Sequence, residues 1–293
     1  MISSSEKRGL EMKLWWANQL DRAGLAALSI PAIAIVGAAL LIPLGWLVWL
    51  SFHSDAGVLT VANYTRLAEP IYVSAFLTTL KISFLVTAAC TLIGYPLAYL
   101  LVQLTPRIRS VALLFVLVPF WTSLLVRTYA WIAILQRKGI VNTALLNTGL
   151  IESPLPLLYN VFGVVVGMTH IMLPFLVLPL MGSMAAFDGA LTRAANSLGA
   201  SPLRAFWTVF FPLSLPGLLA GSSLVFVLSL GLYVTPALLG GSKVHVWAMR
   251  IENDVSLYGN WGVASAVGVV LVLTTSAVLL AFNKFIRIKS ASR

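Results

Sequence analysis

The chain has 293 residues, of which 59% are hydrophobic and only 10% are charged. Soluble domains carry roughly 25% charged residues, so this composition excludes a protein whose whole surface faces water. The net charge of +10 would by itself fit a nucleic-acid-binding protein. The basic residues, however, are concentrated between long apolar blocks, and we interpret them as markers of the two sides of a membrane.

Six apolar blocks contain no Asp, Glu, Lys or Arg over most of their length. A helix needs roughly 20 mainly apolar residues to cross the hydrocarbon layer, and each block reaches or approaches that length. The predicted fold class is therefore an all-α polytopic membrane protein. Its six transmembrane helices are expected at residues 25–52, 74–102, 110–135, 158–181, 209–236 and 260–283.

The basic residues are distributed unevenly between the two sides of this arrangement. With the N-terminus inside, twelve of the 19 Lys and Arg residues fall on the inner side, five on the outer side and two within spans. The positive-inside rule then places both termini in the cytoplasm. The expected organisation is a cytoplasmic tail, 1–24, a six-helix membrane domain, 25–283, and a basic cytoplasmic tail, 284–293. The longest inner loop, 182–208, joins spans four and five.

The other spans are connected by three outer segments, 53–73, 136–157 and 241–259, and by an inner turn at residues 105–107. Residues 136–157 contain an amphipathic piece, Ile140–Ile151, and residues 241–259 are polar. The acidic side chains Glu152, Glu252 and Asp254 lie in these segments and can line an outer mouth.

The inner loop has the pattern of a short amphipathic helix, Phe187–Leu198, whose apolar side holds Phe187, Leu191, Ala194, Ala195 and Leu198. Gly199 follows, where a left-handed C-terminal cap is expected. Ser201 and Pro202 then have the pattern of an N-cap followed by proline at the first helical position. The sequence predicts two short helices that meet at a glycine hinge and lead into span five. On periodicity alone, a plain interfacial helix is the alternative.

The same loop resembles the "EAA" loop of ABC-type importer permeases, in Arg193–Pro202 (RAANSLGASP), Phe206 and Phe211–Gly217 (FPLSLPG). The resemblance implies the type I ABC importer permease fold, with this loop as a cytoplasmic coupling helix that docks on an ATPase subunit. The expected coupling residues are Phe187, Leu191, Arg193, Ala194, Ala195, Leu198, Gly199, Ala200, Ser201 and Pro202. Arg193 replaces the family's glutamate and reverses the charge there. The alternatives are a differently charged partner surface or a side chain that only faces solvent.

Three further segments, Arg127–Trp131, Pro154–Asn160 and Tyr233–Gly241, resemble the spermidine/putrescine branch of these permeases. The resemblance implies a polyamine as the leading substrate. Similar permeases import other small organic solutes, such as amino-acid derivatives and phosphonates, and these stay as alternatives. The implied setting is a bacterial inner membrane with membrane lipid around the chain, a second permease subunit, two ATPase subunits and a periplasmic solute-binding protein.

The energy source is expected to lie outside this chain. The sequence contains no G-x-x-x-x-G-K-[ST] phosphate loop, and none of its nine acidic residues falls within a predicted span, where a secondary carrier places its ion relay. We expect no cofactor on this chain, with ATP and Mg²⁺ used by the partner ATPase. One cysteine and three scattered histidines predict no metal site. A stand-alone carrier or channel is the rival class, and a membrane-embedded enzyme is the third.

The solute path has few candidates in the sequence. Lys81 and Arg127 are the two ionisable residues within spans, where a charge is a functional-site hypothesis, although both can also reach outward to water. Trp121, Tyr129, Trp131 and Tyr233 can stack on a cationic amine, or can be residues of the membrane interface. His170 is interpreted as a packed, hydrogen-bonded side chain. Because no carboxylate lies within a predicted span, the acidic groups that would bind a polyamine are expected on a second permease or at the outer mouth.

Overall fold

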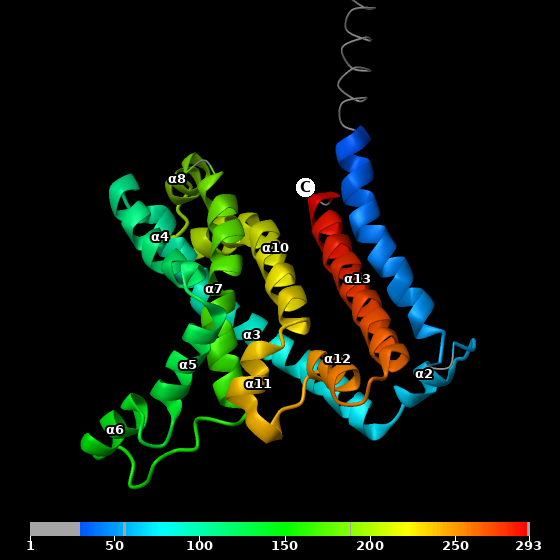
Figure 1. Cartoon of the computed structure of the whole chain (residues 1–293). Coiled ribbons are helices and arrows are strands. Elements are labelled where there is room, and N and C mark those ends of the chain that lie inside the picture. Colours follow the sequence, from blue (N-terminus) through cyan, green and yellow to red (C-terminus); the bar gives the residue numbers. More distant parts are fainter. Residues whose placement is uncertain (1–29, 55–56, 188, 292–293) are drawn as a thin grey trace, which may run out of the picture.

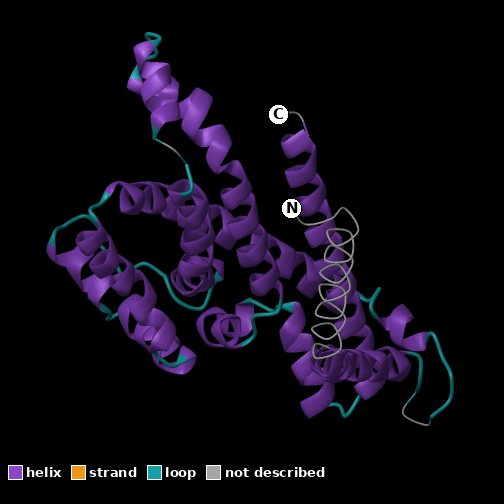
Figure 2. Ribbon diagram, turned by 90° about the horizontal axis from the view of Figure 1, so that it is seen from above, coloured by secondary structure: helices purple, strands orange, loops and turns teal. Residues whose placement is uncertain are grey.

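The structure is a computed structural model that describes residues 30–54, 57–187 and 189–291. The predicted N-terminal tail, 1–24, and Asp188 lie outside the described residues. Within these ranges the regular structure is helical, apart from one isolated bridge between His53 and Leu59, and Figure 2 shows helices joined by short loops. The prediction of an all-α polytopic membrane fold is confirmed. Five helices are long and apolar enough to span a membrane, or six if one bent pair counts as a single span.

The elements follow one another in a simple order. A first helix, Ile30–Ser51, precedes α2 (Ala62–Arg66), α3 (Pro70–Gln103), α4 (Pro106–Trp121), α5 (Leu124–Leu135), α6 (Ile140–Asn147), α7 (Val161–Ala185), α8 (Ala190–Ser197), α9 (Pro202–Ala205), a π-helical turn (Phe206–Phe210), α10 (Phe211–Leu230), α11 (Val234–Gly240), a 3₁₀ turn (Gly241–Lys243), α12 (Trp247–Ser256) and α13 (Trp261–Ala291). In Figure 1, α8 and the C-terminal end of α13 lie at one end of the molecule. Helices α6, α11, α12 and α2 lie at the other end.

Helices α3, α7 and α10 form the centre of the molecule. Their contact surfaces bury Val86, Met168, Leu176 and Val225 completely. Small residues allow α10 to approach α7 closely, as is common between membrane helices. At Gly221 an added Cβ atom would lie 2.9 Å from the carbonyl oxygen of Leu176. The packing of α10 on α7 therefore depends on a missing side chain.

A second cluster joins α12 and α13 to the beginning of α3. Tyr72, Trp247, Val263 and Val267 are buried together. The indole Nε1 of Trp247 donates a hydrogen bond to the carbonyl oxygen of Val267 (2.9 Å), and its backbone N–H donates to Oγ1 of Thr79 (2.7 Å). These bonds fix α12 against two long helices.

Two predicted spans need correction. The third, 110–135, is not a straight helix, because α4 and the segment after it are bent by 100° at Thr122 and Ser123. Pro119 lies one turn before this break, in a position where proline removes a helical hydrogen bond. The fifth, 209–236, ends at Leu230, and residues 231–233 separate it from α11.

Other boundaries also differ from the prediction. Helix α3 begins at Pro70, because proline is favoured at the first helical position. Helix α13 continues to Ala291, so most of the expected C-terminal tail, 284–293, prolongs the last helix. The polar segment 241–259 contains the unpredicted helix α12.

Candidate functional site

The turn between α8 and α9 has the geometry expected from its sequence. Gly199 has φ +89°, the left-handed region in which glycine carries no steric cost. The backbone N–H of Gly199 donates to the carbonyl oxygen of Asn196 (3.0 Å), and that of Ala200 donates to Ala195 (3.1 Å). These bonds satisfy carbonyl groups that a helix end leaves free. The predicted glycine cap is confirmed.

The second half of the turn is capped as well. Ser201 Oγ accepts a hydrogen bond from the backbone N–H of Arg204 (3.3 Å), and Pro202 occupies the first turn of α9. The predicted boundaries need one correction, since α8 begins at Ala190 and leaves Phe187 outside the helix. The second short helix is also not separate. Residues Pro202–Leu230 form one apolar helical stretch that includes the π-helical turn and α10.

The tip of this structure exposes apolar side chains. Leu198 is 90% exposed and Leu191 is 51% exposed. Arg193, Ala194 and Ala200 flank them, with Arg193 and Ala194 exposed and Ala200 half-buried. A neighbouring apolar group on the next helix comprises Leu203 and Trp207, both exposed. Exposed apolar side chains that gather at one end of a protein are typical of a protein–protein contact.

The base of the turn is held by aromatic rings. Phe206 packs edge-on against Tyr99 of α3, with ring centroids 5.5 Å apart, and Phe210 packs against the same tyrosine at 5.1 Å. Phe187, just before α8, contacts Phe210 at 6.0 Å. Tyr95 and Ser214 share a hydrogen bond of 2.9 Å between their hydroxyl groups. These contacts connect the segments on both sides of α8 with α10 and α3.

The turn between α3 and α4 lies at the same end. The guanidinium group of Arg109 donates hydrogen bonds to the backbone carbonyl oxygens of Leu101, Val102 and Leu104, at 3.0–3.1 Å. The last carbonyl groups of a helix lack intrahelical partners, so this one side chain caps α3. The sequence alone did not reveal this contact, because nothing in the spacing of a basic residue indicates which carbonyl groups it reaches.

The six predicted solute-path residues do not form one site. Lys81 is exposed on α3, and Trp121 and Tyr129 are exposed on either side of the α4–α5 break. Trp131 instead turns inward and donates a hydrogen bond from Nε1 to Nδ1 of His170 (3.2 Å), which confirms the interpretation of His170 as a packed, hydrogen-bonded residue.

Arg127 is half-buried one helical turn before Trp131, and Tyr233 lies at the start of α11. The roles of all six in solute transport stay predictions.

Two of the segments that resemble the spermidine/putrescine branch, Pro154–Asn160 and Tyr233–Gly241, meet at the other end of the molecule. The backbone N–H of Tyr159 donates to the carbonyl oxygen of Leu239 (2.9 Å), which ties the segment before α7 to α11. Asn160 Oδ1 then caps α7 by accepting from the backbone N–H of Gly163 (3.0 Å).

At this end a buried carboxyl group makes a structural contact that the sequence did not predict. Asp254 is 3% exposed, and its Oδ1 accepts a hydrogen bond from the Tyr72 hydroxyl group (2.9 Å). Burial raises the pKa of the Asp254 carboxyl group, although the Tyr72 hydrogen bond and the nearby Arg250 and Arg66 oppose that shift. In the sequence the apolar residues of the same short segment, Trp247, Met249, Ile251 and Val255, are the signal that could have shown its packing.

In the described ranges no three His, Cys, Asp or Glu side chains lie close enough together to hold a metal ion. Cys90 is a buried free thiol among the described residues. The arrangement at the α8 end can act as a docking element.

These features define a class: a multi-pass helical membrane protein with an exposed, capped helical turn at one end. The fold agrees with that of a bacterial alginate ABC transporter in complex with an alginate-pentasaccharide-bound periplasmic protein, with a TM-score of 0.72, 17% identity and coverage of 94% of this chain and 98% of that chain. No family model matches the sequence.

The sequence relatives narrow the class. The chain is 34% identical over 226 residues to the spermidine/putrescine transport system permease protein PotB of Haemophilus influenzae. This alignment covers 77% of this chain and 79% of the relative. It is 35% identical over 225 residues to PotB of Escherichia coli, and this alignment covers 77% of this chain and 82% of that relative. The chain therefore belongs to the family of ABC transporter permeases that includes PotB. It is a multi-pass permease component of an ABC importer in the inner membrane.

Proposed function

We propose that this chain forms half of the pore of an ATP-driven polyamine importer. The supporting observation is its identity of 34–35% to two spermidine/putrescine permeases over 77% of its length. The segments Pro154–Asn160 and Tyr233–Gly241, which resemble this branch, also meet in the fold through the bond between Tyr159 and Leu239. Spermidine or putrescine is the proposed substrate.

The α8 turn is the proposed contact with the ATPase. Its exposed leucines, Leu191 and Leu198, can enter an apolar groove on that subunit, while the capped ends on either side of Gly199 keep the turn at a fixed angle. Closure of two ATPase subunits around ATP and Mg²⁺ would move α8, and the aromatic contacts at Phe206 and Phe210 would pass the movement to α10 and α3. In this proposal all of the ATP chemistry belongs to the partner subunits.

Arg193 gives this docking contact a specific charge. The side chain is exposed on α8, where it can face the rim of the partner's groove. A partner that carries an acidic side chain at this rim would pair with arginine and be repelled by the family's usual glutamate.

The proposed orientation places the α8 end in the cytoplasm. The positive-inside rule favours it, and the common position of α8 and the C-terminal end of α13 in Figure 1 is compatible with it. The opposite end, with α6, α11 and α12, then faces a periplasmic solute receptor. In this proposal a second permease subunit completes the pore.

The test is uptake by the reconstituted importer. The chain is co-expressed with its second permease and ATPase and placed in proteoliposomes, and uptake of radiolabelled spermidine and putrescine is measured with receptor outside and ATP inside. We expect uptake that requires both ATP and receptor. An excess of 2-aminoethylphosphonate should not reduce this uptake. Competition by the phosphonate but not by polyamines would refute a polyamine as the substrate. Uptake by the isolated chain without ATPase would refute the class.

A further inference from the structure

A cavity lies at the end of the molecule opposite α8, between α5, the segment before α7 and the 3₁₀ turn after α11. It has a volume of about 600 Å³. The lining residues are Ile132, Leu135, Gln136, Arg137, Leu155, Pro156, Leu157, Leu158, Tyr159, Gly241, Ser242 and Lys243. No acidic side chain is among them, so the wall combines an apolar floor with two cations.

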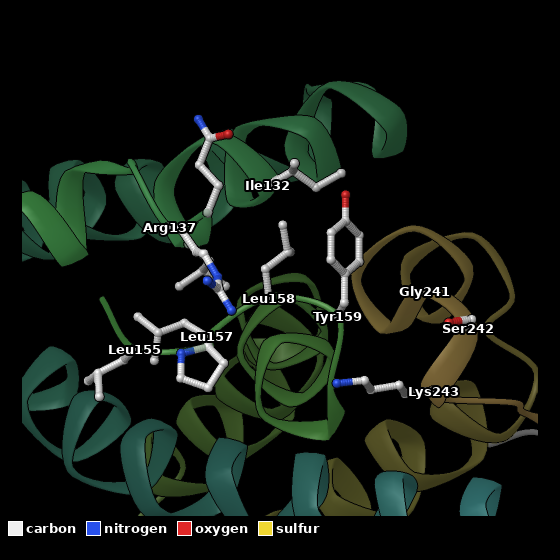
Figure 3. A pocket seen from close by; sticks show the side chains of 12 residues that line it. Ile132, Arg137, Leu155, Leu157, Leu158, Tyr159, Gly241, Ser242 and Lys243 are labelled. Atoms are coloured by element: carbon white, nitrogen blue, oxygen red, sulfur yellow. The ribbon is translucent and has the colours of Figure 1, made fainter. Parts of the chain in front are cut away.

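Those two cations face the same space. Arg137 and Lys243 come from segments more than one hundred residues apart in the sequence, yet Figure 3 shows the nitrogen-bearing ends of both side chains pointing toward the middle of the group of lining residues. Both are exposed. Among the residues that the structure describes, neither side chain has an ion pair or hydrogen bond, so their charges are available to a ligand.

The walls of this cavity are fixed by the fold. Tyr159 is the one described non-glycine residue with positive φ (60°), and its backbone N–H is held by Leu239. Gly241, with φ +57°, lies so close that an added Cβ atom would be 2.9 Å from the Tyr159 ring. Strained backbone of this kind persists where the surroundings hold it, and it is frequent at binding sites.

Asn142 fixes the far wall. It is fully buried, donates from Nδ2 to the carbonyl oxygens of Gln136 and Leu155, and accepts at Oδ1 from the backbone N–H of Leu155. A cavity built before its ligand arrives loses little entropy on binding.

The charge of the cavity has the wrong sign for the proposed cargo. A polyamine is repelled by Arg137 and Lys243, whereas a carboxylate can pair with both, and arginine binds carboxylates through two parallel hydrogen bonds. A receptor that holds a polycation must itself carry carboxylates around its binding cleft. In the proposed importer the mouth of that cleft would face the permease when the cargo is handed over.

We propose that this cavity receives an acidic side chain from the rim of the solute receptor's cleft. This inference depends on the proposed function. Arg137 and Lys243 dock the receptor by charge complementarity, and they neutralise carboxylate charge as the polyamine leaves it. The cavity therefore acts both as a docking site and as an electrostatic aid to release.

The test uses the complete importer in proteoliposomes with its receptor titrated from outside. In Arg137→Glu/Lys243→Glu we expect the receptor concentration for half-maximal uptake to rise at least tenfold. Arg137→Gln/Lys243→Gln should give a smaller rise, about threefold, because the attraction is removed but no repulsion is added. Lys138→Glu is the matched control, since Lys138 is adjacent and exposed but does not line the cavity. Its titration should match that of the wild-type protein within about twofold.

The ATPase rate without receptor monitors folding and should be equal in all four proteins. If the wild-type importer responds to receptor and the double variants respond identically, the inference is overturned while the proposed function stands. If even the wild-type importer ignores receptor, the proposed function itself fails. In the last part of the experiment, the receptor titrations are repeated in vesicles of phosphatidylcholine with and without phosphatidylglycerol. A defect that appears only with the anionic lipid would identify a headgroup site and also overturn the proposal.

Discussion

The two ends of this molecule are built by different means. At the α8 end the turn is set by neighbours in sequence, with Gly199, Ser201 and Pro202 forming one compact pair of caps. At the α12 end the segments are held by polar contacts between residues far apart, such as Tyr72 with Asp254 and Thr79 with Trp247. The shape of the turn at the first end is therefore defined locally, whereas the second end depends on several specific bonds between distant residues.

The packing of α10 on α7 connects the two ends, and its loss should have the largest effect. In Gly221→Val the new side chain meets the backbone of Leu176, including its carbonyl oxygen at 2.9 Å from the Cβ position. Backbone cannot rotate away, so we expect a loss of about 3 kcal/mol, at the upper end of overpacking costs. Thermal unfolding in detergent should show this loss as a lower midpoint.

Gly182→Val on the facing helix is the matched control. An added Cβ atom at Gly182 meets nothing within 4 Å, and valine is a better helix former than glycine. Its unfolding midpoint should equal or exceed that of the wild-type protein. Equal destabilisation of both variants would show that close approach at Gly221 is not what joins the helices.

The α12 end should be sensitive to a single buried amide. In Asn142→Leu the backbone N–H of Leu155 and two carbonyl groups lose their partner, at a cost of about 2 kcal/mol for unsatisfied buried groups. The damage should be local. Limited proteolysis should cut the segment 150–158 faster, while receptor-free ATPase activity stays intact. Thr143→Leu, at the next and exposed position of α6, should leave the cleavage rate unchanged.

The two ends also differ in how far the sequence predicted them. The turn at Gly199 was predicted correctly because a cap depends on a few adjacent residues, and apolar length identified the spans. The break at Thr122 was missed because an apolar block has the same composition whether its helix is straight or bent. Helix α12 was missed since its polar residues looked solvent-facing, and only the fold brings Asp254 to Tyr72. The cavity between Arg137 and Lys243 likewise depends on the fold.

The proposed role of the α8 turn as a lever can be tested at Gly199. In Gly199→Val the new side chain has open space around it, so the cost is backbone strain alone, about 1–2 kcal/mol for a left-handed residue. We expect the turn to open, so that at least tenfold less polyamine is transported for each ATP hydrolysed while membrane insertion is normal.

Gly199→Asn should retain most of this coupling, because asparagine tolerates the left-handed region. Arg193→Glu should also be tolerated better than Gly199→Val. The reverse order of damage would show that charge, rather than the hinge, determines docking.

The smallest expected effect is the pH response of Asp254. Burial raises the pKa of its carboxyl group above the ordinary value of 3.8, so the folded protein holds this proton more tightly than the unfolded chain does. Its contribution to stability is therefore greatest below pH 3.8 and is lost as the pH rises through the raised folded pKa. Unfolding midpoints measured from pH 4 upward should fall in this window for the wild-type protein. In Asp254→Asn that part of the slope should vanish, whereas Glu252→Gln on the same helix should preserve it. A slope that survives in Asp254→Asn would assign the titration to another group and would leave the α12 end held by hydrogen bonding and packing alone.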